Sequence, residues 1–280
     1  MLVKVVITAA GKGTRLLPFT KEIPKEMMPI FSRYGSKEKI VRPILEVIYE
    51  QLYSAGGRNF SIIIDKRKDA IRKYFTMDKK FLNELDKKQK RTILKFYQHL
   101  EKSKINWVNQ KSQLGFGHAV KISERYVGKD DFIVHAGDAV IISKNRHPIS
   151  RLIDIGKNDP EISAVILCKK VKDAKRYGVP EIEKSSKSYD IVKNVVEKPK
   201  KPKSDLGILP LYYFKDDIFN SLKKIKPGRL NEYQLTDAIQ KLIENNKKVV
   251  AIKLQKNEYE LDVGTVATLK STQEISYKYG

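Results

Sequence analysis

The amino-acid sequence predicts an α/β fold, in which a Rossmann-like, mixed but mostly parallel β-sheet is flanked by helices and carries a small antiparallel extension. Two observations lead to this prediction. Up to about residue 138, apolar runs of strand length alternate with longer segments of helical periodicity, which is typical of parallel strands joined by crossover helices. After about residue 149, the apolar runs are shorter and turn residues separate them, which favours antiparallel pairing. No low-complexity linker or repeat interrupts the chain, so we expect a single domain over residues 1–280.

In the first part of the chain, four apolar runs predict buried strands. They lie at Leu2–Ala9, Phe60–Asp65, Ile105–Gln110 and Phe132–Asp138. Helical spacing between them predicts a helix at Arg42–Ala55 that ends at a Gly-Gly pair, lysine-rich helices up to about residue 102, and a helix from about His118.

In the second part, strand-like runs lie at 163–171, 177–183, 190–198 and 208–214. Two helical patterns follow, at Asn231–Asn245 and Gly264–Tyr279. The strand-like runs are too closely spaced for a crossover helix between each pair, so they form the expected extension of the first sheet.

The formal net charge of +23 predicts a surface that attracts polyanions such as nucleic acid, acidic membranes or phosphorylated metabolites. The basic segments mix acids and leucines at helical spacing and do not interleave aromatic residues, so nucleic acid is an unlikely partner. No apolar run reaches the length of a membrane span, so we expect no membrane partner. A single cysteine, Cys168, excludes an internal disulfide and suits a reducing, cytoplasmic location.

The loop after the first predicted strand begins with a turn of small residues that contains Gly11 and Gly13. Successive backbone N–H groups in such a turn form a concavity that binds anions, and glycine allows a ligand to approach the backbone closely. The letters do not match the Walker A loop. They also lack the third glycine of the dinucleotide-binding fingerprint, where Leu16 stands instead.

The same loop is basic and cannot form a regular helix. Pro18, Pro24 and Pro29 interrupt it, because proline lacks a backbone donor and restricts the residue before it. The irregular loop is expected to direct Arg15 and Lys25 into the crevice beyond the carboxyl ends of the strands, where open α/β sheets bind ligands.

Residues Ala10–Pro29, "AGKGTRLLPFTKEIPKEMMP", resemble the signature of the UTP–glucose-1-phosphate uridylyltransferases, within the wider family of sugar-nucleotide pyrophosphorylases. Further segments resemble that family in the same order along nearly the whole chain. They are "NQKSQLGFGHA", "HAGD", "YGV", "VEKP", "NEYQLTDAI" and "ELDVGT".

The resemblance implies the family's fold and reaction. An oxygen of a sugar 1-phosphate attacks the α-phosphorus of UTP (or dTTP), with Mg²⁺ as cofactor, and pyrophosphate leaves. It also implies a nucleotide-binding half at residues 1–138, a sugar-phosphate-binding half at residues 139–280, and a homo-oligomer, either a dimer or a tetramer. Both reactants are anions, so such a site needs cations and alignment more than it needs a nucleophilic side chain.

By resemblance, Arg15 neutralises the leaving β- and γ-phosphates, and Lys25 lies between the α-phosphate and the incoming phosphate. Lys198 holds the sugar phosphate. Asp138 and Asp262 bind Mg²⁺ as oxygen ligands. The expected catalytic residues are therefore Arg15, Lys25, Lys198 and Asp138.

The resemblance also implies two sets of binding residues. Those expected at the nucleotide are Ala10, Gly11, Gly13, Thr14, Glu26, Gln110 and Gly115. Those expected at the sugar are Gly178 and Glu197, together with Lys198. His118 is expected to begin a helix beside the base pocket, and His135 to be a core residue.

Some segments depart from the uridylyltransferase pattern. Residues 35–43 alter an approach loop, the "AGD" and "LDVGT" segments resemble the thymidylyltransferases, and Leu209-Pro210 stands where the family tends to place a glycine. A glucose-1-phosphate thymidylyltransferase, or a pyrophosphorylase of broad sugar and nucleotide specificity, therefore remains an alternative. A non-catalytic nucleotide-sugar sensor is an alternative of another class, although such a sensor has no need of the whole set of cations and aspartates.

Overall fold

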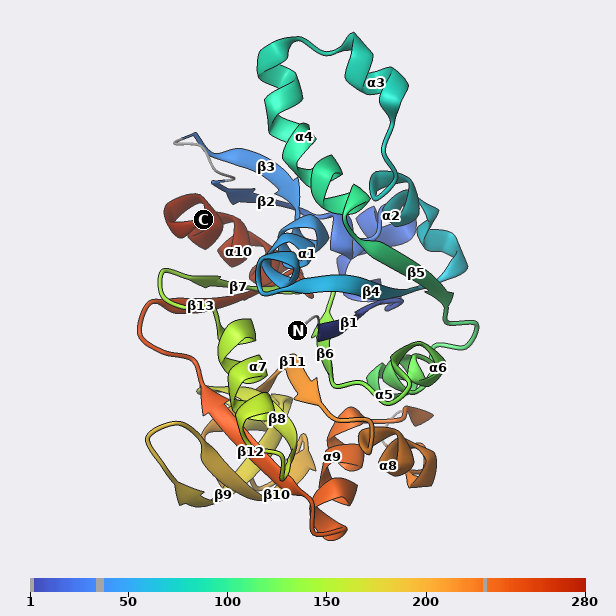
Figure 1. The fold of residues 1–280 in the computed structure, drawn as a ribbon. Helices are drawn as coiled ribbons and strands as arrows, with labels where there is room; N and C mark the ends of the chain where they lie inside the picture. The colour runs from blue at the N-terminus through green and yellow to red at the C-terminus, as the bar shows by residue number, and fades with distance from the viewer. Residues whose placement is uncertain (1–2, 34–37, 229–230) are drawn as a thin grey trace.

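The computed structural model describes residues 3–33, 38–228 and 231–280 (Figure 1). Its central feature is a nine-stranded sheet with the order β5-β4-β1-β6-β11-β8-β12-β10-β9. In chain order these strands are β1 (Val3–Ala9), β4 (Gly57–Ile64), β5 (Lys104–Asn109), β6 (Phe132–Ala136), β8 (Ile162–Lys170), β9 (Gly178–Ser185), β10 (Asp190–Glu197), β11 (Leu206–Phe214) and β12 (Lys248–Lys253).

The sheet is mixed but mostly parallel, as the sequence predicts. Strands β5, β4, β1 and β6 run parallel, and β8 pairs in parallel with β12. Of the strands described in this sheet, only β11 and β10 point in the direction opposite to the rest, so each is antiparallel to both of its neighbours. Of the four strands predicted in the extension, β9 and β10 form an antiparallel pair at the edge of the sheet, whereas β8 and β11 lie within the sheet, between β6 and β12.

Helices cover both faces of the sheet (Figure 1). They are α1 (Ile44–Ser54), α2 (Asp69–Tyr74), α3 (Lys79–Glu84), α4 (Lys87–Glu101), α5 (Phe116–Lys121), α6 (Glu124–Val127), α7 (Pro148–Asn158), α8 (Ile218–Lys224), α9 (Leu235–Glu244) and α10 (Val266–Tyr279). On β1, Val6 packs into the core beneath α5, α8 and α9, whereas Ile7 packs into the core beneath α1 and α7. Because both faces are buried, the strand is apolar except at Lys4 and Thr8, rather than alternating.

Two small antiparallel sheets flank the main one, and the sequence analysis did not predict them. Strand β7 (Ala139–Ser143) pairs with β13 (Glu258–Asp262), and β2 (Pro29–Ser32) pairs with β3 (Ile40–Pro43). Helices α7 and α8 and strand β12 were also missed. Helix α8 is short, whereas α7 is as long as α1 and begins at Pro148, whose fixed φ suits the first helical position.

Several predicted boundaries shift. Helix α1 begins at Ile44 because the preceding two residues belong to β3, and α9 begins at Leu235 rather than Asn231. Gly56, with φ 101°, ends the first helix, but Gly57 already pairs in β4. Leu2, part of the altered loop at 35–43, and residues 229–230 lie outside the described residues.

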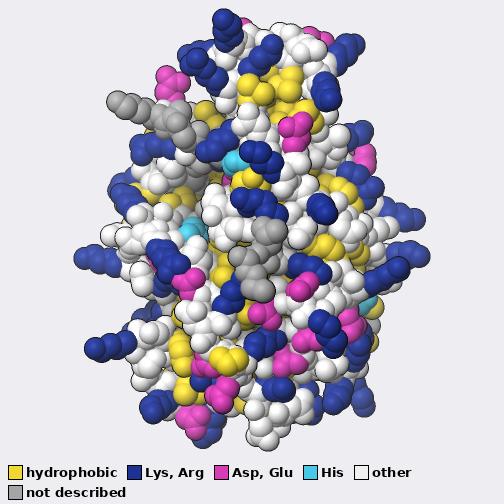
Figure 2. All heavy atoms as spheres, viewed as in Figure 1, with side chains coloured by type: hydrophobic (Ala, Val, Ile, Leu, Met, Phe, Trp, Pro, Cys, Tyr) yellow, Lys and Arg dark blue, Asp and Glu magenta, His cyan; other side chains and the backbone are white. Residues whose placement is uncertain are grey.

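Lysine and arginine side chains are spread over the face seen in Figure 2 and alternate with acidic ones. They do not gather into one basic stripe there, which fits a solvated charged surface better than a nucleic-acid track. No helix in the described part of the chain is long and apolar enough to cross a bilayer.

Candidate active site

A cleft of about 400 Å³ opens at the carboxyl ends of β1, β5 and β6. It is lined by Thr8, Ala10, Gly11, Lys12, Gly13, Thr14, Arg15, Lys25, Glu26, Gln110, Gln113, Gly115, Phe116, Ala119, Ala136, Asp138, Glu232 and Gly264. All the residues that the sequence predicts at the nucleotide are among them. The carboxyl ends of parallel strands meet at one edge of the sheet, which explains why segments distant in the sequence converge here.

The opening loop forms three single 3-10 turns instead of a helix, η1 (Thr14–Leu16), η2 (Phe19–Lys21) and η3 (Lys25–Met27). Gly13 has φ 68°, a left-handed conformation that favours glycine, and Thr20 Oγ1 donates to its carbonyl oxygen at 2.8 Å. Within the described chain, no oxygen accepts a hydrogen bond from the backbone N–H groups of Gly11, Lys12 or Gly13. These three residues line the cleft and their N–H groups have no protein acceptor among the described residues, as an anion-binding concavity requires.

Lys25 from the loop forms an ion pair with Asp138, which follows β6. The side chains are only 15% and 22% exposed. Burial by itself lowers the pKa of Lys25, but the Asp138 and Glu26 carboxylates outweigh burial and raise it. Burial likewise raises the pKa of Asp138, and Lys25 outweighs this and lowers it. Both groups are therefore charged at neutral pH, and the ammonium group is held at the cleft before any substrate binds.

Glu26 is anchored by a lysine that the sequence analysis did not single out. Lys68 Nζ lies 2.7 Å from each carboxylate oxygen of Glu26, which is 1% exposed. Burial raises the pKa of Glu26 and lowers that of Lys68. Glu26 lines the cleft as predicted, but Lys68 already contacts both of its carboxylate oxygens. In the structure, Glu26 therefore anchors the loop beneath Lys25.

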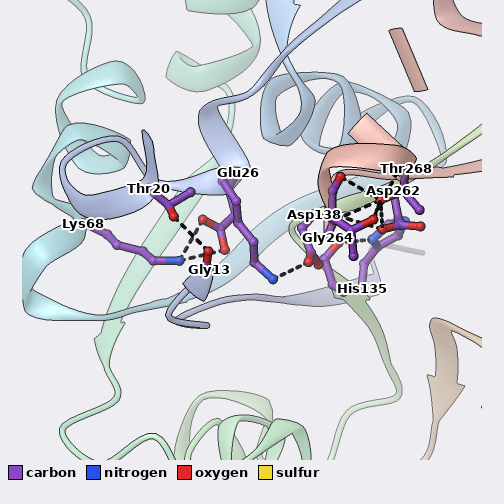
Figure 3. Close-up of polar contacts among 12 residues, drawn as sticks. Gly13, Thr20, Glu26, Lys68, His135, Asp138, Asp262, Gly264 and Thr268 are labelled. Atoms are coloured by element: carbon purple, nitrogen blue, oxygen red, sulfur yellow. Dashed lines mark hydrogen bonds and ion pairs between the residues drawn. The ribbon is translucent and has the colours of Figure 1, made fainter. Parts of the chain in front are cut away.

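Asp262 lies beside Asp138 because β13 pairs with β7. Asp262 is opposite Ala139 in that ladder, and Val263 N donates to Asp138 O at 3.1 Å. Asp262 Oδ1 accepts hydrogen bonds from Gly264 N at 2.7 Å and Thr268 Oγ1 at 3.0 Å (Figure 3). The two aspartates predicted as metal ligands are thus brought together, although they are far apart in the sequence.

Gly264 separates Asp262 from the Arg15 guanidinium. A Cβ atom at Gly264 would lie 2.9 Å from Asp262 Oδ1 and 3.2 Å from an Arg15 nitrogen. A side chain at position 264 would crowd the Asp262 carboxylate and would require the Arg15 guanidinium to shift. Arg15, Asp138 and Gly264 line the cleft, and Asp262 lies behind Gly264.

The Asp138 and Asp262 carboxylates suit a divalent cation whose remaining oxygen ligands come from a bound ligand and water. Asp262 Oδ2 takes no hydrogen bond from the described residues, so it is available as a ligand. No three His, Cys, Asp or Glu side chains gather among the residues described, so the protein by itself offers no complete cage. Mg²⁺ is commonly held by one or two carboxylates, with phosphate oxygens and water completing its shell.

A second pocket, of about 290 Å³, adjoins the cleft and contains the residues predicted at the sugar, which are Gly178, Glu197 and Lys198. Phe116 and Glu232 line both cavities. Glu197 accepts a hydrogen bond from Thr236 Oγ1 at 2.7 Å and lies 3.0 Å from Lys198 Nζ.

Gly178 is required in this pocket for a steric reason. A Cβ atom there would lie 2.9 Å from Thr236 Oγ1 and 3.2 Å from Glu197 Oε2. The substitution would therefore push into the hydrogen bond that orients the Glu197 carboxylate.

Sequence reasoning missed several residues of the two cavities. They are Lys12, Gln113, Phe116, Ala119, Glu232, Gln234 and Thr236. Most of them lie within the segments "NQKSQLGFGHA" and "NEYQLTDAI", which the resemblance had already marked. The signal was therefore present, but the second segment had been interpreted only as a helix start.

A model of the nucleotidyl transferase family matches residues 4–277. The chain belongs to this family. The resemblance predicted from the sequence is thereby confirmed. Among curated nucleotidyl transferases, the UTP–glucose-1-phosphate uridylyltransferase of Staphylococcus epidermidis is 34% identical over 98% of this chain and 92% of its own length. The enzyme of that name from Staphylococcus haemolyticus is also 34% identical, again over 98% of this chain and 92% of its own length.

Solved structures of this family share the fold. An apo UDP-glucose pyrophosphorylase superposes with a TM-score of 0.89 at 27% identity, covering 99% of both chains. A UTP-bound enzyme from Acinetobacter baumannii superposes with a TM-score of 0.83 at 28% identity, covering 100% of this chain and 94% of its own.

Proposed function

We propose that the protein is a Mg²⁺-dependent nucleotidyltransferase that makes UDP-glucose and pyrophosphate from UTP and glucose 1-phosphate. The single observation that best supports this is that Arg15 and the Lys25–Asp138 pair line one cleft, with Asp262 behind Gly264 at its wall, and that this cleft adjoins a second polar pocket. Relatives that carry this activity in their names match nearly the whole chain.

The reaction needs charge neutralisation more than proton transfer. A phosphate oxygen of glucose 1-phosphate forms a new bond to the α-phosphorus, while the bond to the bridging oxygen of pyrophosphate breaks. Every reacting group is an anion, so preorganised cations lower the barrier by stabilising the charge that moves onto the leaving group.

Each cation has a task that suits its position. Arg15 grips phosphate oxygens of the leaving pyrophosphate, because a guanidinium can bind two oxygens at once. Lys25 stands between the α-phosphate and the incoming phosphate, and Lys198 holds the sugar phosphate. Asp138 and Asp262 would hold Mg²⁺, which supplies Lewis-acid neutralisation of phosphate oxygens when it is bound.

The nucleotide and the sugar occupy different cavities in this proposal. The turn at Gly11–Thr14 faces the triphosphate with its free N–H groups, and Gln110 and Gly115 face the base. Glu197 and the Gly178 backbone face the sugar. Most residues of the larger cleft come from 1–138 and most residues of the second pocket from 139–280, which supports a nucleotide-binding half and a sugar-phosphate-binding half, although Glu232 and Gly264 reach the first cavity and Phe116 the second.

A thymidylyltransferase or a broad-specificity pyrophosphorylase is the second candidate. Pro210 lines the second pocket, where a glycine was expected from the family pattern. A proline ring takes space that glycine leaves open, so this pocket could favour a different sugar.

A substrate panel separates these candidates. The protein is incubated with Mg²⁺, with UTP or dTTP, and with a set of sugar 1-phosphates. The nucleotide sugar is identified by mass, and pyrophosphate is measured in parallel. We expect UDP-glucose to form fastest. A preference for dTTP would replace the uridylyl assignment, and no product from any pair would favour the non-catalytic sensor.

We further propose a cytoplasmic homo-oligomer, a dimer or a tetramer, as the family resemblance and the single buried Cys168 suggest. Light scattering of the purified protein tests the oligomer directly, because a monomeric mass at micromolar concentration would contradict it.

A further inference from the structure

The amide group of Gln110 is held in one orientation by protein contacts at the base end of the cleft. Gln110 follows β5, is 4% exposed, and its backbone N–H donates to Ile64 O at 2.9 Å. Its side-chain Nε2 lies 2.9 Å from His118 Nδ1 and 3.4 Å from Gly115 O.

These two neighbours define which end of the amide is which. The Gly115 carbonyl oxygen can only accept a hydrogen bond, so the amide end beside it is the NH₂ group. His118 Nδ1 then accepts the second hydrogen bond of that NH₂ group, and its proton is on Nε2. Burial and the nearby Lys121 lower the pKa of His118, which keeps the ring neutral and able to accept.

The other end of the amide is left for a ligand. Among the described residues no donor reaches Gln110 Oε1, although Gln110 lines the cleft. An amide oxygen at this place pairs with a base that presents an N–H donor. Uracil and thymine have that donor at N3. Cytosine has a lone pair at N3, which repels the amide oxygen, and its donor is the 4-amino group, so cytosine could pair with this oxygen only in a shifted position.

We infer that His118 is a positioning residue for base selection, and that by accepting from Gln110 Nε2 it makes the site select UTP over CTP. The inference rests on the proposed function and deepens it. His118 does not touch the base in this arrangement. It acts by preventing the Gln110 amide from turning over, which would present NH₂ to the base and accommodate cytosine.

Two substitutions at one position separate this role from simple packing. His118→Phe keeps a ring of similar shape but removes the acceptor. His118→Asn places an amide oxygen near the position of Nδ1 and can still accept. Tyr233→Phe is the matched control, because the Tyr233 ring lies 6.2 Å from the His118 ring and the change leaves that contact in place. A melting curve for each variant confirms that it folds.

The test measures kcat/KM for UTP and for CTP with glucose 1-phosphate and, in parallel, the binding of each nucleotide by calorimetry. Sites built around a ligand's hydrogen bonds can reject analogues that lack them by about 10⁴-fold, so we expect His118→Phe to reduce the UTP/CTP ratio at least tenfold. We expect His118→Asn and Tyr233→Phe to keep the ratio. In a Gln110→Ala background, His118→Phe should change nothing further.

The outcomes distinguish the inference from the proposed function. An unchanged UTP/CTP ratio in His118→Phe would overturn the inference without contradicting the proposed enzyme activity. An equal fall of the UTP/CTP ratio in His118→Phe and His118→Asn would overturn it too. If the unmodified protein binds UTP selectively and His118→Phe loses that selectivity, but no sugar nucleotide forms, the inference stands and the proposed reaction fails. If UTP does not bind, both are wrong.

Discussion

The two cavities of the site hold their cations in different ways. In the larger cleft, called the nucleotide cleft below because we propose that it binds the nucleotide, Lys25 pairs with Asp138. These residues are 113 positions apart in the chain, and the lysine side chain is 15% exposed. In the second pocket, called the sugar pocket below because we propose that it binds the sugar, Lys198 pairs with its sequence neighbour Glu197. The lysine side chain is 39% exposed. The first cation is fixed by the tertiary fold, and the second is fixed mainly by its own strand end.

This difference indicates where preorganisation matters most. A charge held rigidly in a partly buried place needs no reorganisation during the reaction, whereas a more exposed one is screened by water and can move. We therefore expect changes at the nucleotide cleft to act on turnover with every substrate. Changes at the sugar pocket should act mainly on the affinity for the sugar phosphate.

The largest effect should come from Asp138→Asn. The change removes the partner of Lys25 and one of the two proposed metal ligands, and stabilisers of this kind are each worth about 10²–10³ in kcat, so the loss should reach about 10³-fold. Pyrophosphate release at saturating substrates measures it. Asp130→Asn, at a 63% exposed aspartate paired with Lys4, is the matched control. Near-normal turnover in Asp138→Asn would contradict the assignment of Asp138 to the active site.

Arg15→Gln should have the next largest effect. It removes the guanidinium beside Gly264 and leaves the loop turn in place, so kcat should fall about 10²-fold. Arg67→Gln, at a 71% exposed arginine outside the nucleotide cleft, is the comparison. Equal effects of the two changes would mean that general positive charge, rather than the position of Arg15, assists the reaction.

Lys198→Met should affect one substrate only. We expect KM for glucose 1-phosphate to rise about tenfold, with a much smaller change in KM for UTP, since an exposed charge contributes on the order of 1 kcal/mol. Lys203→Met, at a 67% exposed lysine paired with Glu181, is the control. If kcat falls as much in Lys198→Met as in Asp138→Asn, the proposed difference between the two cavities, turnover at one and sugar-phosphate affinity at the other, is wrong.

The smallest expected effect concerns stability beneath the nucleotide cleft. Burial lowers the pKa of His135, on β6, to about 4 from an ordinary 6.5. Between these pH values the unfolded chain takes up a proton that the folded chain refuses. The unfolding free energy should therefore fall as pH drops, by up to about 1.4 kcal/mol per pH unit from this group.

Urea unfolding of the unmodified protein and of His135→Phe, at pH 4.5, 5.5 and 7, measures the contribution of this histidine. The variant should lose less stability on acidification. Parallel pH dependences in the two proteins would show that His135 is not kept neutral by the fold.

The opening loop could be predicted from the sequence because its information is contiguous. Glycines, prolines and cations lie within twenty residues, and each constrains the backbone locally. The approach of Asp262 to Asp138 was expected only through family resemblance, because it depends on the pairing of β13 with β7, and neither strand was predicted. Residues 132–142 are apolar except for His135 and Gly137-Asp138, so β7 was not distinguished from β6.

The supporting contacts were beyond sequence reasoning. Lys68 stands in a run of three basic residues, and nothing in the letters marks it as the one that is buried against Glu26, 42 residues away. The hydrogen bond between Gln110 and His118 likewise depends on how α5 begins after Gly115, whose φ is 95°. Such contacts follow from tertiary packing, which local patterns do not encode.

The central claim of the proposed function is that Asp138 and Asp262 would hold a metal ion that neutralises phosphate oxygens of the nucleotide beside Lys25 and Arg15. It is tested most directly with UTP in which one or the other non-bridging oxygen of the α-phosphate is replaced by sulfur. Mg²⁺ binds sulfur poorly and softer metals bind it well. We expect one of the two isomers to react slowly with Mg²⁺ and to recover with Cd²⁺, and we expect Asp262→Asn to abolish the recovery. Equal rates for both isomers with either metal would contradict the claim.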